Sequence, residues 1–319
     1  MRLAFVFPGQ GAQRVSMGRD LAERYPERAG QVFAEADDLL GFPLSRLCFD
    51  GPAEELQRTE ITQPALFVTS VATLRAVAPE LPPPAVVAGH SLGEYAAMVA
   101  AGVLDWRDGL RLVRRRGELM AGVNARTPGA MAAVIGPDEE AVTAVCVRAR
   151  AATGEVVEVA NHNDDGQHVI SGTVAAVSEA TRLLSASAGA DVRVVPLKVG
   201  APFHSSLMRA IQDEFAADLD AVPFHDPVVP VVVNATATAV RSGAAARAAL
   251  RAQLASPVLW RQSMLVLAGQ GLDATLEIGP GKVLTGIARR MFPGLPTYPV
   301  TGARPLATAV AELTGVLVS

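Results

Sequence analysis

Short apolar runs alternate with longer segments of helical periodicity along most of this sequence. Leu3 to Phe7 and Ala85 to Ala88 are typical of buried strands, and each ends at a glycine-bearing turn. Between them, Pro64 to Val77 has helical spacing, and we expect Pro64 in the first turn, where its missing N–H costs nothing. A further helix with an arginine-rich face is expected at 106–123. The alternation predicts an α/β fold with a mostly parallel sheet.

The pattern changes from Gly129 onward. Here we expect strands at 130–135, 156–160, 168–171 and 192–197, helices at 138–150 and 175–187, and a polar turn at 161–166. The order β-α-β-β-α-β is that of a ferredoxin-like unit. We therefore predict a small inserted subdomain over 129–198 and a large domain built from 1–128 and 199–319. The later part of the large domain is expected to hold helices at 205–219, 243–254, 257–269 and 282–292, and strands at 229–233 and 275–278.

The composition argues against several classes of function. Only 5% of the 319 residues are aromatic and the formal net charge is -4, so we expect no nucleic-acid partner. The two cysteines, Cys48 and Cys146, have no paired spacing, which argues against a disulfide framework and a zinc site. The first apolar run is interrupted by Pro8 and no run of about 18 apolar residues occurs, so neither a signal peptide nor a membrane span is expected. We expect a cytoplasmic enzyme.

The strongest local motif is Gly89-His90-Ser91-Leu92-Gly93, which lies between an apolar strand and a helical segment. In that context Gly-x-Ser-x-Gly is a nucleophile elbow, in which glycines allow close packing around a strained serine with an exposed Oγ. The amides at the start of the following helix favour negative charge, so the N–H of Leu92 can help to hold an oxyanion. By itself the pentapeptide is also compatible with an ordinary tight turn.

A serine nucleophile needs a base, and the sequence holds five histidines. His90 adjoins the serine and should point to the other side of the turn, whereas His162 and His168 lie in the predicted subdomain and His225 lies in a polar loop. His204 remains, at the start of a helix after a predicted buried strand. A lone histidine there is usually a capping or core residue, but together with a serine elbow it becomes the candidate general base.

A second glycine turn, Gly9-Gln10-Gly11, follows the first strand. No Gly-Lys-Ser/Thr follows it, so a phosphate loop is not supported, and a dinucleotide fingerprint is not matched either. We therefore expect no bound cofactor.

Several motifs, taken in order, resemble those of malonyl-CoA:acyl-carrier-protein transacylases and the acyltransferase domains of polyketide synthases. The resemblance covers nearly the whole chain and implies an α/β-hydrolase-like large domain, a ferredoxin-like small one and an active site between them. The motifs that carry it are Phe7-Pro-Gly-Gln-Gly-Ala-Gln13, Thr62-Gln-Pro-Ala-Leu66, Gly89-His-Ser-Leu-Gly-Glu94, Arg116-Gly117, Asn161, Pro202-Phe-His-Ser205, Gln253-Leu-x-x-Pro-Val-x-Trp260 and Glu277-Ile-Gly-Pro-Gly281.

The resemblance implies a role for each matching catalytic position. Ser91 is similar to the family's nucleophile and His204 to its base, and Gln10 is expected to support the oxyanion together with the Leu92 amide. Gln253 matches the position whose backbone carbonyl orients the histidine. This carbonyl replaces the aspartate of a triad, so the resemblance implies a serine–histidine dyad.

The resemblance also implies a set of substrate-binding residues. Arg116 matches the arginine that binds the free carboxylate of malonate, for which a planar guanidinium suits better than a lysine. Gln63, Asn161 and His90 are similar to polar residues of the cleft. Phe203 stands where fatty-acid enzymes commonly carry serine and where malonyl-specific polyketide acyltransferases tend to carry phenylalanine. Since the chain also looks free-standing, these features favour a discrete acyltransferase serving a polyketide synthase in trans, with a fatty-acid role still open.

The implied activity is an acyl-carrier-protein S-malonyltransferase that uses malonyl-CoA and a phosphopantetheinylated carrier protein. Lys282, Arg289 and Arg290 are candidates for docking an acidic carrier. One alternative is an esterase, for which an acidic residue should stand between the serine and a late histidine. Another is a proofreading acyl hydrolase, which would have little use for a carboxylate-binding arginine. A non-catalytic carrier-binding module is the last, and the intact serine, histidine and glutamine set argues against it.

Overall fold

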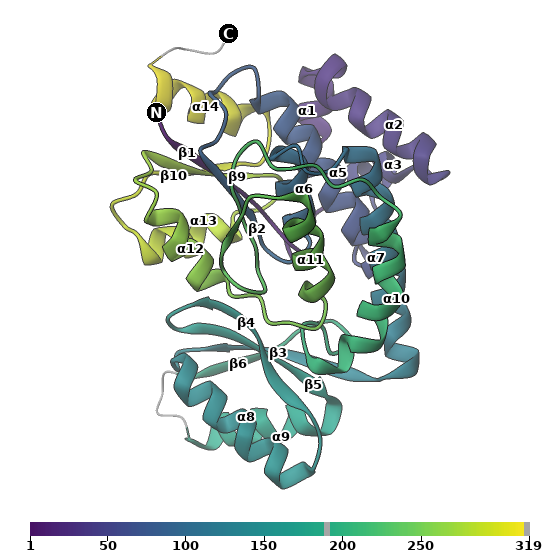
Figure 1. Ribbon diagram of the computed structural model, residues 1–319, viewed down its shortest axis with the longest axis vertical. Coiled ribbons are helices and arrows are strands. Elements are labelled where there is room, and N and C mark those ends of the chain that lie inside the picture. The colour runs from purple at the N-terminus through teal and green to yellow at the C-terminus, as the bar shows by residue number, and fades with distance from the viewer. Residues whose placement is uncertain (188–191, 316–319) are drawn as a thin grey trace.

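The computed structural model describes residues 1–187 and 192–315 and contains two separate sheets (Figure 1). The larger has six strands in the order β10-β9-β1-β2-β7-β8, and every neighbouring pair that includes β1, β2 or β9 is parallel. The strands are β1 (Leu3–Phe7), β2 (Val86–Gly89), β7 (Val231–Val232), β8 (Ala239–Val240), β9 (Ala274–Ile278) and β10 (Thr297–Val300).

The centre of this sheet is buried on both faces. Leu3, Phe5 and Phe7 of β1 join one apolar cluster, whereas Ala4 and Val6 join a second cluster on the opposite face, as the two-residue period of a strand requires. This double burial explains why the strand is a continuous apolar run in the sequence. Because both faces of the sheet are covered, side chains from different loops can meet only at its edge, at the carboxyl ends of β1, β2 and β7.

The helices begin and end as follows: α1 (Arg19–Arg24), a π-helix (Pro26–Gly30), α2 (Gln31–Leu40), α3 (Leu44–Asp50), α4 (Ala53–Leu56), α5 (Thr59–Val77), α6 (Gly93–Ala100), α7 (Trp106–Arg126), α8 (Glu139–Thr153), α9 (Val174–Ser187), a 3-10 turn (Ser206–Met208), α10 (Arg209–Asp220), α11 (Gly243–Gln253), α12 (Trp260–Ala268), α13 (Val283–Met291) and α14 (Ala303–Thr314). The predicted helix at 205–219 is therefore divided at Met208. The predicted strand at 229–233 is shorter, and α1 to α4, β8, β10 and α14 were not anticipated.

Pro64 differs from its predicted position in the first turn of a helix. The helix α5 begins at Thr59, so Pro64 lies in its interior. A proline there leaves the carbonyl of the residue four positions earlier without its helical donor. That carbonyl, of Glu60, accepts a hydrogen bond of 3.0 Å from Arg114 Nη1, which compensates for the missing N–H and lets the helix continue through the proline.

The second sheet is antiparallel, with the order β4-β5-β3-β6. Its helices α8 and α9 lie on the face turned away from the large sheet (Figure 1) and enclose an apolar cluster of their own. The order of elements and the strand order are those of a ferredoxin-like unit, so the predicted fold class is confirmed. The division of the chain into 129–198 and two flanking segments stays a prediction. The strands are β3 (Gly129–Ile135), β4 (Val157–Asp164), β5 (Gln167–Thr173) and β6 (Arg193–Pro196).

The prediction of a polar turn over 161–166 is wrong. Strand β4 continues through it to Asp164, and only the two residues before β5 form the turn. The continuation is held from the large domain, because the backbone of Val258 donates to Ala160 at 2.8 Å and accepts from His162 at 3.0 Å. Sequence polarity misled the prediction because residues 161–164 are buried and find polar partners within the protein: Asn161 and Asn163 line the pocket, and His162 lies 3.3 Å from Glu139 of α8.

In the described part of the chain, no helix combines the length and the apolar character that crossing a bilayer requires.

Candidate active site

The predicted elbow connects β2 to α6 at the carboxyl edge of the large sheet. Ser91 adopts a left-handed backbone conformation with φ of 50°. The glycines on either side are needed for space: a Cβ on Gly89 would lie 2.0 Å from the Gly93 carbonyl group, and one on Gly93 would lie 2.1 Å from the Phe7 carbonyl oxygen. The tight turn therefore follows directly from Gly-x-Ser-x-Gly, and it presents the Ser91 side chain to the pocket.

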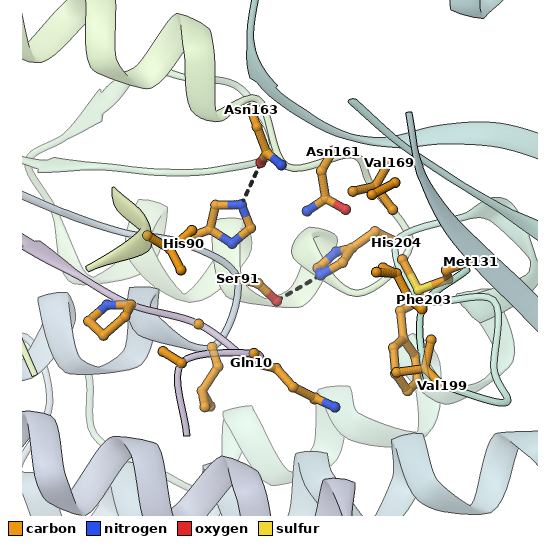
Figure 2. A pocket seen from close by; sticks show the side chains of 18 of the residues that line it. Gln10, His90, Ser91, Met131, Asn161, Asn163, Val169, Val199, Phe203 and His204 are labelled. Carbon is orange, nitrogen blue, oxygen red and sulfur yellow. Dashed lines mark hydrogen bonds between the residues drawn. The ribbon is translucent and has the colours of Figure 1, made fainter. Parts of the chain in front are cut away.

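His204 lies opposite the serine, with Nε2 at 2.7 Å from Ser91 Oγ (Figure 2). Its Nδ1 faces the backbone carbonyls of Gln253 at 3.1 Å and Ser256 at 3.2 Å. Because both partners of Nδ1 only accept, Nδ1 carries the proton and Nε2 accepts from the serine hydroxyl. Burial, with a further contribution from the Arg116 charge, lowers the pKa of His204 to about 3. The imidazole is therefore neutral at neutral pH and able to take a proton.

Arg116 of α7 extends its guanidinium beneath the serine and is 1% exposed. Its Nη1 donates to Gln63 Oε1 at 2.7 Å, and its Nη2 lies 3.0 Å from Gln253 Oε1 and 3.2 Å from Ser91 Oγ. Burial lowers the pKa of Arg116, but a guanidinium stays charged at neutral pH. Within residues 1–187 and 192–315 no carboxylate forms an ion pair with it. A buried cation of this kind favours binding of an anionic group beside Ser91.

Gln253 connects the three groups around it. Its backbone carbonyl accepts from His204, its Oε1 accepts from Arg116, and its Nε2 donates to the Ser91 carbonyl at 2.9 Å. The side chain is fully buried at the end of α11. One residue therefore orients the imidazole, the guanidinium and the backbone of the elbow together.

Some backbone N–H groups around the serine already donate a hydrogen bond within the protein, and others do not. The N–H of Ser91 already donates to Asn234 Oδ1 at 2.6 Å. In the chain as far as it is described, the N–H groups of Gln10 and Leu92 donate to no protein acceptor, and both residues line the pocket. The side-chain amide of Gln10 is directed to Thr59 Oγ1, at 3.4 Å. The two free backbone amides are thus the groups available to an oxyanion.

The pocket has a volume of about 310 Å³ and lies between the two sheets. Part of its wall is apolar: Figure 2 shows Phe203 beside Met131 and Val199, to the right of the Ser91–His204 pair. Phe203 is 6% exposed and directly precedes His204 in the chain. Its position next to the imidazole makes the ring part of the boundary around any group attached to Ser91.

His90 and two asparagines from β4 line the same pocket. His90 does not point to the far side of the turn as predicted, but towards the small subdomain, where its Nε2 lies 2.9 Å from Asn163 Oδ1. Its ring also packs edge-on against Trp260, at 5.5 Å between centroids. Burial lowers the pKa of His90. Asn161 lies next to this pair and is 6% exposed. The continuation of β4 through the expected turn is what brings both asparagines here.

The basic residues proposed for carrier docking are partly used within the protein. Arg290 forms an ion pair with Asp164 at 2.5 Å and donates to Gln167 at 2.9 Å, so it connects α13 to the small sheet. Arg289 donates to the Thr297 carbonyl at 2.8 Å. Lys282 is exposed just before α13. A docking role for these three residues stays a prediction.

Sequence reasoning missed Asn234, Ser256 and Asn163. Asn234 carried the clearest signal, since it is the first polar residue after a predicted buried strand, at the edge where α/β proteins build their sites. Ser256 contributes only a backbone carbonyl, which no residue type indicates. Asn163 was noted only as part of the expected polar turn.

The geometry agrees with what comparison to known proteins finds. Residues 4–305 match the family of acyl transferase domains. The chain is 44% identical over 310 residues to the malonyl CoA-acyl carrier protein transacylase of Escherichia coli, covering 97% of this chain and 99% of that one. It is 41% identical over 312 residues to the Bacillus subtilis protein of the same name, covering 98% and 97%. A solved malonyl-transacylase in complex with its type II polyketide synthase acyl-carrier protein is similar with a TM-score of 0.93 at 40% identity, covering 98% and 100%.

Proposed function

Because this chain belongs to the acyl transferase domain family, we propose that it transfers a malonyl group from malonyl-CoA to the phosphopantetheine thiol of an acyl carrier protein. The observation that carries the proposal is the environment of Ser91 Oγ, which lies 2.7 Å from a neutral histidine nitrogen and 3.2 Å from a buried guanidinium. The first contact suits a nucleophile and its base, and the second suits a substrate with a free carboxylate.

In the first half-reaction, Ser91 Oγ attacks the thioester carbonyl of malonyl-CoA while His204 Nε2 takes the hydroxyl proton. The carbonyl oxygen becomes an oxyanion that the N–H groups of Gln10 and Leu92 stabilise. Collapse of this intermediate breaks the C–S bond, and the sulfur of coenzyme A leaves with the proton held by His204. The malonyl group then remains as an ester on Ser91.

In the second half-reaction, the thiol of the carrier protein gives its proton to His204 and attacks the ester carbonyl. The ester C–O bond breaks and the same proton returns to Ser91 Oγ. Every proton that moves is carried by a side chain of this protein, so the chemistry proposed needs no bound cofactor.

Arg116 supplies selectivity for a dicarboxylic acyl group. Its guanidinium would pair with the malonate carboxylate, exchanging one or both of its amide contacts for a bidentate ion pair. Such a pair in a buried site favours malonyl over acyl groups that lack the second carboxylate. The presence of this carboxylate-binding arginine also argues against a proofreading hydrolase, which would have little use for it. The esterase alternative is less well supported, because His204 Nδ1 faces two backbone carbonyls rather than a carboxylate.

The proposal is tested with radiolabelled malonyl-CoA and holo carrier protein. We expect one malonyl mass on the enzyme, ping-pong kinetics and transfer of label to the carrier. The Ser91→Ala variant should acquire no label at all, which is the largest single effect expected for this protein. Label released as free malonate would support a hydrolase instead, and label retained by Ser91→Ala would show that another residue is the nucleophile.

We further propose that the enzyme serves polyketide carrier proteins, for which Phe203 is the supporting residue. Competition between a polyketide and a fatty-acid carrier protein, measured as kcat/KM for each, tests this. A cytoplasmic location is likewise a proposal, to be tested by fractionation.

A further inference from the structure

Asn234 is fully buried two residues after the end of β7, where it contacts both the elbow and α6. Its Oδ1 accepts from the Ser91 N–H at 2.6 Å, and its Nδ2 donates to the Gly89 carbonyl at 2.6 Å. The assignment of the two amide atoms follows from these partners, since one can only donate and the other can only accept. A single side chain therefore spans the peptide groups on both sides of His90.

This contact matters because the backbone of Ser91 is strained. A serine in the left-handed region is unfavourable and persists only when its surroundings hold it there. Both backbone groups of Ser91 are held from distant parts of the chain, the N–H by Asn234 and the carbonyl by Gln253 Nε2 at 2.9 Å. Of the two side chains, Asn234 also bonds to the carbonyl of Gly89, the last residue of β2, so it connects the end of that strand to the nucleophile.

The backbone N–H and carbonyl of Asn234 are hydrogen-bonded as well. Its N–H donates to Glu94 Oε2 at 2.7 Å, and its carbonyl accepts from the Leu259 N–H at 3.1 Å. Glu94 is fully buried on α6, the helix that follows the nucleophile. The backbone of Asn234 is thus anchored to α6, which follows the turn, and to the segment that precedes α12.

We propose that Asn234 is a positioning residue for the nucleophile: it holds Ser91 in its left-handed conformation with Oγ directed at His204, and by occupying the Ser91 N–H it leaves the oxyanion to the amides of Leu92 and Gln10. The inference rests on the proposed function, because it concerns acylation of Ser91. It adds to that function a residue which touches no reacting atom.

The first test is Asn234→Ala, measured by rapid-quench acylation with malonyl-CoA. Loss of the support displaces a reacting oxygen, and displacements of about 1 Å can cost roughly 100-fold, so we expect the acylation rate to fall by about 10- to 100-fold. The KM for malonyl-CoA should change little, since Arg116 keeps its contacts with Gln63 and Gln253. A variant with the wild-type rate, or one that loses only affinity, would overturn the inference.

The second test is Asn234→Asp, which nearly preserves shape. A neutral carboxyl can accept from Ser91 and donate to Gly89, as the amide does, whereas an ionised carboxylate repels the Gly89 carbonyl. Burial favours the neutral form. We expect the ratio of the variant's acylation rate to that of the wild type to rise as pH falls, while the same ratio for Asn234→Ala stays level.

Each variant's acylation rate is divided by the wild-type rate at the same pH, because other ionisable groups around the elbow also change the rate with pH. Glu94 faces Asn234 from α6, Arg116 and His204 face Ser91, and His90 lies between the two bonded peptides. All four are present in every enzyme compared. A ratio for Asn234→Asp that falls as pH falls would contradict the positioning role even if Asn234→Ala failed to fold, and so would a ratio that equals the Asn234→Ala ratio at every pH.

Thr236→Ala is the matched control, because Thr236 lies in the same loop but is exposed, and among the described residues its hydroxyl contacts only Thr238. It should acylate at the wild-type rate. Failure of the wild type itself to acquire a malonyl ester would refute the proposed function, whereas a labelled wild type with a fully active Asn234→Ala would refute only the inference.

Discussion

The two walls of the pocket are built on different principles. The wall around Ser91 is polar and hydrogen-bonded: Ser91, Arg116 and Gln253 are joined by hydrogen bonds to one another and to residues far away in the chain. The wall around Phe203 is lined by apolar side chains such as Met131 and Val199, which offer shape rather than hydrogen bonds. We therefore expect the polar wall to govern the chemistry and the apolar wall to govern the choice among related acyl groups.

This difference leads to different expectations for substitutions. A change on the polar wall should alter the reaction with every acyl group or with every acyl group of one charge. A change on the apolar wall should alter the ratio between similar acyl groups, by the modest free energies that methyl groups are worth in apolar pockets.

The largest effect on substrate choice is expected from Arg116→Ala on the polar wall. Leaving a carboxylate unpaired in a buried site costs about 2–5 kcal/mol, so kcat/KM for malonyl-CoA should fall roughly 30- to 5,000-fold. Acetyl transfer should survive or improve. Arg115→Ala is the control, because the neighbouring guanidinium pairs with Glu214 and Asp218 on α10 instead. Equal losses for malonyl and acetyl would show that Arg116 is structural.

A smaller effect is expected from Phe203→Ser, which places a polar side chain on the apolar wall. The ring borders the space next to His204 and leaves little room for an added methyl group. The wild type should therefore prefer malonyl to methylmalonyl by roughly 10- to 200-fold in kcat/KM, which is the usual discrimination for one methyl group in an apolar pocket. The serine variant should reduce this preference. The measurement is the ratio of kcat/KM for the two thioesters with one carrier protein. A ratio unmoved by the substitution would remove Phe203 as the selecting residue.

The smallest effect concerns the pH dependence of the polar wall. Burial and Arg116 lower the pKa of His204 from 6.5 to about 3, so the base is lost only as pH falls well below 6.5. The acid limb of kcat/KM for the acylation step, which reports the free enzyme, should therefore lie below that value. Removing the Arg116 charge makes protonation of His204 easier, so in Arg116→Ala the limb should move to higher pH. Acetyl-CoA is the substrate for this measurement, and a limb near 6.5 in the wild type would contradict it.

Much of this architecture could be predicted because it is local. The apolar runs of β1 and β2 and the β-α-β-β-α-β order of the small subdomain are properties of contiguous residues. The elbow is local too, since only glycine fits at Gly89 and Gly93. The local reasoning failed where a distant segment supplied a partner, as Arg114 does for the helix around Pro64.

The site itself combines both kinds of information. The Gly-x-Ser-x-Gly motif points to Ser91 without any structure, because nucleophilic attack needs a hydroxyl on a tight turn, whereas only the resemblance to a known family indicated Arg116 among the many arginines. Residue type does not reveal that Asn234, 143 positions from Ser91, holds its amide, or that Gln253, 162 positions away, holds its carbonyl. Hydrogen bonds depend on distance and direction in space, and those are set only when the carboxyl ends of the strands and the loops behind them have packed together.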